Sequence, residues 1–150
     1  MHKVLIALIV GFLTAGQAAA SEKAAVMAAV HQIVDGFNKG DTKSLLSTCA
    51  NETSIIDEVP PHEWHGAGGC SAWMKDYDVF AQKKQIADAV TTLGVPRRIE
   101  ITEDNAYVVV PAKCDYKQAG KPVHENVIVT VSLHKSDASW RLTGWTWARL

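Results

Sequence analysis

The sequence predicts an α+β fold in which three N-terminal helices pack on an antiparallel sheet. Two observations lead to this class. In the first half, apolar residues recur at helical spacing, since Val26, Val30, Ile33 and Phe37 lie four, three and four residues apart. From Val95 onward, apolar and polar residues alternate between turn residues, which is typical of antiparallel strands.

The first residues have the pattern of a secretory signal peptide. Lys3 precedes a short apolar run over residues 4–13, and residues 18–20 form an A-x-A cleavage site. We expect cleavage after Ala20, a periplasmic or secreted protein, and one domain over residues 21–150. No later segment holds the roughly 18 consecutive apolar residues of a spanning helix, so we expect no membrane association after cleavage.

Charge and motifs exclude several classes of partner. Without Lys3 the chain carries 14 basic (15 − 1) and 16 acidic side chains and no basic cluster. Nucleic acid is therefore not an expected partner. The sequence also lacks a P-loop, a dinucleotide-binding glycine motif and a GxSxG nucleophile turn, and we expect no cofactor.

Two helices and a strand are expected before the proline pair. The first helix opens at Ser21 or Glu22 and stops at Gly40, and Asp41 caps a second helix over residues 42–48. The segment ETSII that follows has the β-branched residues of a strand.

A third helix and a meander of strands complete the domain. Trp73, Tyr77 and Phe80 lie at i, i+4 and i+7 and share one helix face. The strands after residue 95 reverse at turns near residues 103–105, 119–120 and 136–137.

The three turns fix a register that sorts the strand residues onto two faces. A slip by one residue would exchange the faces, and this register collects aliphatic residues on one of them. That face is suited to packing under helices. The expected pairs are Ile99 with Val108, Val110 with Val129, and Val131 with Gly144.

The opposite sheet face is mixed and rich in aromatic residues. Because the helices cover only one face, we expect a homodimer through this outer face. The residues expected at the centre of its interface are Tyr107, Ile128, Trp145 and Trp147.

A chain reversal after the first strand predicts one disulfide. Two prolines follow this strand, and proline suits a turn because it fixes φ and lacks an N–H. If the chain reverses at Val59-Pro60, residues equally far from this point face one another, and Cys49 and Cys70 are such a pair. We therefore expect a Cys49–Cys70 disulfide and a free thiol at Cys114.

Two segments resemble a known family. "DEVPPHEWHG" (57–66) and "WRLTGWTW" (140–147), within this order of elements, resemble the SnoaL-like proteins, and a secreted bacterial subgroup of them. These belong to the nuclear-transport-factor-two-like (NTF2-like), or ketosteroid-isomerase-like, superfamily. Over residues 22–149 the resemblance implies a cone, in which a strongly curved sheet wraps the helices and leaves a pocket at its open end. It also implies dimers through the outer sheet face and, in the enzymes, isomerase, dehydratase or cyclase chemistry.

Asp57 is the first candidate catalytic residue. It ends an apolar strand, at the position where the resemblance places the base of the isomerases. If Asp57 faces the pocket, desolvation raises its pKa and suits it to proton transfer. The alternative is a solvated carboxylate at a strand end. In a regular strand Glu58 would point to the other face.

Glu125 and His62 are candidates for the second proton. The register puts Glu125 on the aliphatic face, so we expect it at the pocket mouth or in a structural pair with Lys113 or Lys121. An imidazole titrates near neutrality, so His62 or His65 at the pocket rim fits general acid–base catalysis. The alternative for both histidines is a plain surface position. They lack a third strong ligand nearby, and we expect no metal site.

Three aromatic residues, Trp64, Trp73 and Tyr77, are expected to wall the pocket, with core packing as their alternative role. With the acids, they predict a pocket for a small, largely apolar organic molecule with acid–base chemistry. The alternative is a non-catalytic module that binds proteins and fills its pocket with its own aromatic residues.

Overall fold

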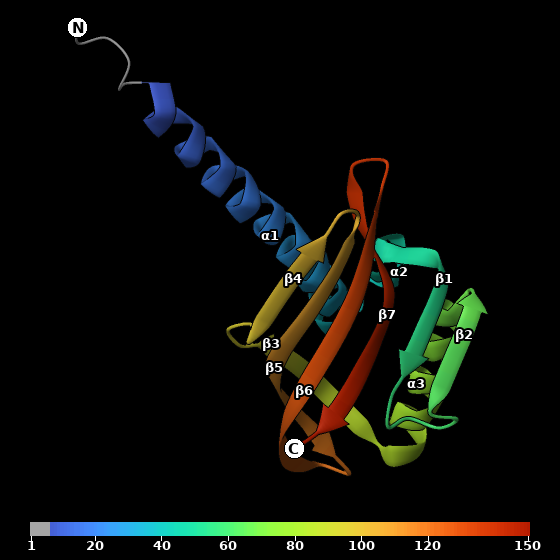
Figure 1. Ribbon diagram of the computed structural model, residues 1–150. Coiled ribbons are helices and arrows are strands. Elements are labelled where there is room, and N and C mark those ends of the chain that lie inside the picture. Colours follow the sequence, from blue (N-terminus) through green and yellow to red (C-terminus); the bar gives the residue numbers. More distant parts are fainter. Residues whose placement is uncertain (1–6) are drawn as a thin grey trace, which may run out of the picture.

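The computed structural model describes residues 7–150, with side chains placed from residue 16 onward. Within this range three helices pack on a curled seven-stranded sheet, which confirms the α+β class (Figure 1). The elements are α1 (Ala7–Lys39), α2 (Thr42–Thr48), β1 (Cys49–Ile56), β2 (Glu63–Ala67), α3 (Gly69–Lys84), β3 (Ile86–Leu93), β4 (Arg98–Thr102), β5 (Asn105–Gln118), β6 (Lys121–Ser136) and β7 (Ser139–Arg149).

The first helix extends further than expected. It runs without a break from residue 7, through the expected cleavage site, and its N-terminal part projects from the body of the protein (Figure 1). The first six residues of the expected signal peptide lie outside the described residues. Glu22 attaches the helix to the sheet, because its carboxylate accepts hydrogen bonds from Lys135 at 2.6 Å and from the Trp140 indole at 3.1 Å. No helix in the described range is both long and apolar enough to cross a membrane.

The sheet is mixed, and the expectation of a purely antiparallel sheet is wrong. Its strand order is β2-β1-β7-β6-β5-β3, with β4 also paired to β5. Every pair is antiparallel except β1 with β7, where Ile55 lies opposite Trp145 in a parallel ladder. The cause is that β2 covers only one edge of β1, and the last strand of the meander reaches the other edge running in the same direction as β1.

Strand β3 was not expected from the sequence. Its segment IADAVTTL contains two alanines and an aspartate, and Asp88 adopts a positive φ of 56° where the β3–β5 register shifts. A long-range contact supports the strand. The Asn38 amide of α1 bonds both the N–H and the carbonyl oxygen of Thr91, each at 2.8 Å. Sequence periodicity carries no trace of such a contact.

The first two predicted registers are confirmed, and the third is wrong over part of its length. Val131 lies opposite Trp145, one residue away from the expected Gly144. The pair Leu133–Leu142 keeps the expected register, and the next pair is Ser132–Gly144, so β7 holds one extra residue between these pairs. Such a β-bulge reverses the side-chain alternation beyond it. The confirmed pairs are Ile99–Val108 and Val110–Val129.

The bulge turns three side chains of β7 from the outer face to the inside, namely Trp145, Trp147 and Arg149. Trp145 is only 8% exposed and belongs to the core. The expectation that Trp145 and Trp147 form the centre of a dimer interface is therefore wrong. Of the four residues named for that interface, Tyr107 and Ile128 remain on the outer face.

The hairpin and its disulfide are confirmed. Strands β1 and β2 pair antiparallel around the proline pair, from Ile56–Glu63 to Glu52–Ala67. Cys49 and Cys70 form the expected disulfide, with their Cα atoms 6.6 Å apart. The bridge joins the start of β1 to the start of α3, and Cys114 is free and buried.

Candidate functional site

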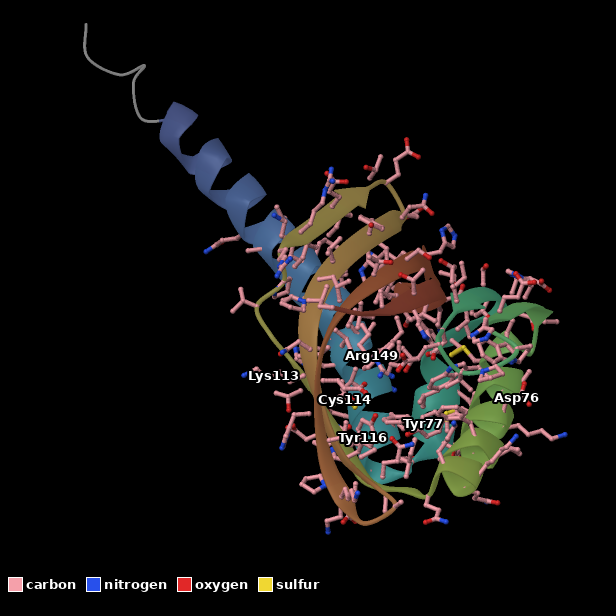
Figure 2. All side chains as sticks on the ribbon, turned by 90° about the horizontal axis from the view of Figure 1, so that it is seen from below. Asp76, Tyr77, Lys113, Cys114, Tyr116 and Arg149 are labelled. Atoms are coloured by element: carbon pink, nitrogen blue, oxygen red, sulfur yellow. A yellow bond between two sulfur atoms is a disulfide. The ribbon has the colours of Figure 1, made fainter. Side chains whose placement is uncertain are left out.

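A cavity of about 340 Å³ lies between α1, α3 and the inner face of the sheet. Figure 2 looks toward it from below, with Tyr77 on α3 and Tyr116 and Arg149 on the sheet. Among the described residues, seven aromatic side chains line the cavity, and aliphatic residues form most of the remaining wall. The seven are Phe37, Trp73, Tyr77, Phe80, Tyr116, Trp145 and Trp147.

Four of these rings pack into one continuous cluster. Phe37 of α1 contacts Tyr77 edge-on with centroids 4.9 Å apart, and Trp73 stands edge-on to Trp145 at 4.8 Å. Trp73 and Tyr77 lie 5.7 Å apart on α3. Such pairs add to the free energy of area burial. They fix one wall of the cavity with rings from a helix pair and the last strand.

Asp57 lies just beyond the end of β1 and faces this cavity. It is 8% exposed. One carboxylate oxygen accepts the Val59 N–H at 3.0 Å, and the other accepts the Trp73 indole N–H at 3.1 Å. Burial raises the pKa of Asp57 above its ordinary value, although these two hydrogen bonds act in the opposite direction. The first expectation for Asp57, a desolvated carboxylate facing the interior, agrees with this geometry.

We predict that the stability difference between the wild type and an Asp57→Asn variant depends on pH. Because the folded state holds the Asp57 proton more tightly than the unfolded state, the wild type loses stability relative to the variant as pH rises above 3.8. The loss ends once pH passes the raised folded pKa. Denaturant unfolding of both proteins from about pH 3 to pH 8 measures the difference, with a slope of at most about 1.4 kcal/mol per pH unit. A difference that moved the opposite way would mean a lowered pKa.

The cavity also has a charged side, centred on Arg149. Its guanidinium contacts Glu58 at 2.7 Å and Glu125 at 3.0 Å. The Tyr116 hydroxyl donates to the same Glu125 oxygen at 2.6 Å. Burial and the neighbouring Glu125 raise the pKa of Tyr116 to about 12, so the phenol keeps its proton at neutral pH. Glu58, mainly by its hydrogen bond, raises the pKa of Arg149.

The structure brings four of the predicted site residues to the cavity, namely Asp57, Glu125, Trp73 and Tyr77. Glu125 has a side chain only 8% exposed, as the aliphatic face of β6 required. Its partner is Arg149, however, and neither of the expected lysines. Burial also raises the pKa of Tyr77 well above its usual value, which keeps this phenol protonated.

Three predicted site residues lie outside the cavity lining. Trp64 is buried, but it packs on α3 and donates its indole N–H to Asp76 at 2.8 Å. His62 is exposed, with a φ of 81°, and its ring contacts the backbone carbonyl of Asp57 at 3.2 Å. His65 is exposed on the outer face of β2 and contacts Ser54 at 2.9 Å. Because side chains alternate along β2, the inward position of Trp64 sends His65 outward.

Other cavity residues were missed by sequence reasoning. Trp145, Trp147 and Arg149 were assigned to the wrong face because the bulge in β7 was not foreseen. Glu58 also lines the cavity, since β1 ends at Ile56 and strand alternation no longer applies to it. The proline turn that follows Glu58 in the sequence was the signal that the strand ends before it. In the described range no three His, Cys, Asp or Glu side chains gather as metal ligands would.

Comparison with known proteins finds matches by structure but none by sequence. No family model and no curated protein matches the chain by sequence. Solved structures do match. One is an NTF2-like protein with a cystatin-like fold from Novosphingobium aromaticivorans, with a TM-score of 0.74 and 13% sequence identity. The match covers 98% of this chain and 92% of the Novosphingobium chain. The chain has the NTF2-like fold.

Two further NTF2-like structures are close in shape. A ketosteroid isomerase-like protein from Erwinia carotovora atroseptica has a TM-score of 0.68 at 16% identity, covering 86% of this chain and 96% of its own. The hexachlorocyclohexane dehydrochlorinase LinA-type3 from Novosphingobium barchaimii has a TM-score of 0.73 at 14% identity, covering 86% of each chain. At these identities the likeness establishes the NTF2-like architecture alone, and the chemistry has to be argued from the residues of the cavity.

Proposed function

We propose that this protein binds a small, largely apolar organic molecule in the cavity, where Asp57 acts as a general base in isomerase, cyclase or dehydratase chemistry. The observation that carries the proposal is a buried carboxylate in an aromatic cavity, since Asp57 is 8% exposed and its pKa is raised by burial. A carboxylate whose pKa is raised is a stronger base, and it takes up a proton from a substrate more readily than a solvated carboxylate does. Two of the similar structures bear the names of an isomerase-like protein and a dehydrochlorinase, which agrees with this class of chemistry.

Cavity size favours this proposal over a protein-binding module with a filled interior. Small-molecule pockets typically measure about 300–1,000 Å³. The cavity, at about 340 Å³, lies within this range although aromatic rings line much of it. A module that only bound proteins would be free to close this space with its own side chains.

Binding is tested with the neutral fluorescent dye N-phenyl-1-naphthylamine. We expect saturable binding of one dye per chain, and its loss in an Ala89→Trp variant, because Ala89 lines the cavity and tryptophan would fill it. The matched control is Ala87→Trp on the same strand, where the side chain is exposed and dye binding should persist. Equal dye binding by both variants would exclude the cavity as the binding site.

Proton transfer is tested with a ketone. In D₂O the wild type should accelerate α-hydrogen exchange of 2-tetralone, and the Asp57→Asn variant should lose at least about a hundredfold of that rate. NMR spectroscopy measures the exchange. If the wild type binds the dye but the exchange rate stays at its uncatalysed value, the catalytic part of the proposal fails and ligand binding remains.

Export and membership of a secreted subgroup are parts of the proposal. The signal-peptide pattern and the Cys49–Cys70 bridge support them, because disulfides persist in oxidising compartments. The intact mass of the protein from its own host should correspond to a chain that starts at Ser21 and carries the bridge.

We also propose a homodimer through the outer sheet face, centred on Tyr107 and Ile128. Tyr107 is 41% exposed, and Val109 and Pro111 continue an apolar strip beside it on β5. An Ile128→Glu variant is expected to sediment as a monomer at micromolar concentrations at which the wild type is a dimer. The control is Val79→Glu on α3, which places the same charge at an exposed valine away from the sheet. A wild type that sediments as a monomer excludes the dimer.

A further inference from the structure

The charged groups around the cavity are unequally paired. Within the described part of the chain, five charged side chains line it, the acids Asp57, Glu58 and Glu125 and the bases Lys84 and Arg149. Their sum is −1. Arg149 already contacts both glutamates, at 2.7 and 3.0 Å, so its guanidinium is shared between two carboxylates.

Asp57 is the acid without an ionic partner. Of the described cationic side chains, none forms an ion pair with it. Its two oxygens accept hydrogen bonds from two neutral donors, the Val59 N–H and the Trp73 indole. A buried carboxylate without a counter-charge is costly, and a cation supplied from outside would remove that cost.

The remaining base offers little to an anionic ligand. Lys84 is an exposed residue at the last turn of α3, with its ammonium nitrogen 6.0 Å from the centre of the Phe80 ring. An anion drawn deeper than this position would meet the unpaired charge of Asp57. The interior of the cavity therefore disfavours anions.

The walls near Asp57 suit a cation in a second way. Trp73 donates to Asp57 and also belongs to the cluster of Phe37, Tyr77 and Trp145 rings. The face of an aromatic ring attracts cations, most strongly for tryptophan, and the attraction grows when water is excluded. The carboxylate and the rings line the same cavity, and the rings also accommodate an apolar body.

We propose that the ligand of this cavity is an organic cation, an apolar or aromatic molecule whose ammonium group lies beside Asp57. The inference rests on the proposed function, because it specifies the ligand class of the same cavity. Asp57 then serves as counter-charge to the ligand, and the aromatic cluster encloses the remainder.

The test compares two probes of the same shape that differ in charge, phenyltrimethylammonium and tert-butylbenzene. In NMR titrations the wild type should bind the cation at least tenfold more tightly than the neutral probe. The Asp57→Asn variant should lose this preference while it still binds tert-butylbenzene. A Glu63→Gln variant removes an exposed acid outside the cavity lining and should keep the preference.

The outcomes separate the two proposals. Binding of tert-butylbenzene as tight as that of the cation, or tighter, overturns the cationic ligand and leaves the small-molecule function standing. If neither probe nor the neutral dye binds, the proposed function fails and the inference with it. Should the Asp57→Asn variant fail to fold, the wild-type comparison, repeated with benzoate as an anionic probe, still decides, and a preference for benzoate overturns the inference.

Discussion

Replacing both Cys49 and Cys70 with serine is expected to lower the free energy of unfolding by about 3 kcal/mol. The bridge closes a loop with a sequence separation of 21, and the chain-entropy model attributes its effect to a more restricted unfolded state. The bridge also joins β1 to α3, the two elements that carry Asp57 and Trp73 toward the cavity. Urea unfolding without reductant, at matched protein concentration, measures the loss.

The control for the disulfide is the third cysteine. Cys114 is buried but closes no loop, so a Cys114→Ala variant should lose no more than about 1 kcal/mol. Reductant should bring the wild type down toward the double variant and leave the double variant unchanged. If reductant did not change the unfolding midpoint of the wild type, the bridge would contribute nothing to stability.

Local rules in the sequence were sufficient for three hairpins, β1–β2, β4–β5 and β5–β6, but not for all of β6–β7. The Cys49–Cys70 pair, the Ile99–Val108 pair and the Val110–Val129 pair all follow from a turn position and strand alternation, which are local properties. The same rules made Asp57 a candidate for the interior, beside the alternative of a solvated carboxylate, because it lies directly after a strand whose inward side is marked by Ile55.

The same local rules failed where contacts between distant parts of the sequence determine the structure. β3 depends on Asn38 of α1, 53 residues away from Thr91 in the sequence, and no local pattern reports it. The bulge in β7 lies between Leu142 and Gly144, where the pairing of β7 with β1 also shifts register, and most of the domain separates β1 from β7 in the sequence. Since Trp145, Trp147 and Arg149 follow that bulge, three of the twelve aromatic and charged side chains described in the cavity lining were assigned to the wrong face.

The ion-pair partner of Glu125 was also not predictable from local sequence. Glu125 was expected at the pocket mouth or in a structural pair with Lys113 or Lys121, which are close to it in the sequence. It lines the cavity and is paired with a base, but with neither of these lysines. Its partner Arg149 comes from the adjacent strand, and the same guanidinium also contacts Glu58. Pairing between strands depends on the register, so an error of one residue in the register changes the partner of an acid.

Gly144 is where β1 and β7 meet, and a Gly144→Ala variant is expected to lose about 3 kcal/mol of stability. A Cβ atom there would overlap the backbone carbonyl oxygen of Ser54, its partner in the parallel ladder. Backbone cannot rotate out of the way as a side chain can, so β1 must shift or its pairing with β7 must break. Thermal and urea unfolding measure the loss.

The effect of Gly144→Ala should reach the cavity, because the neighbouring pair is Ile55–Trp145 and Asp57 follows just beyond the end of β1. Displacing β1 moves Asp57 away from the Trp73 indole that now bonds it at 3.1 Å. We therefore expect weaker dye binding even at temperatures where the variant remains folded. The control is Ala148→Val, which adds bulk at an exposed position of the same strand and should change stability by less than about 0.5 kcal/mol. Wild-type stability and dye binding in Gly144→Ala would show that the close approach of β1 to β7 does not position the site.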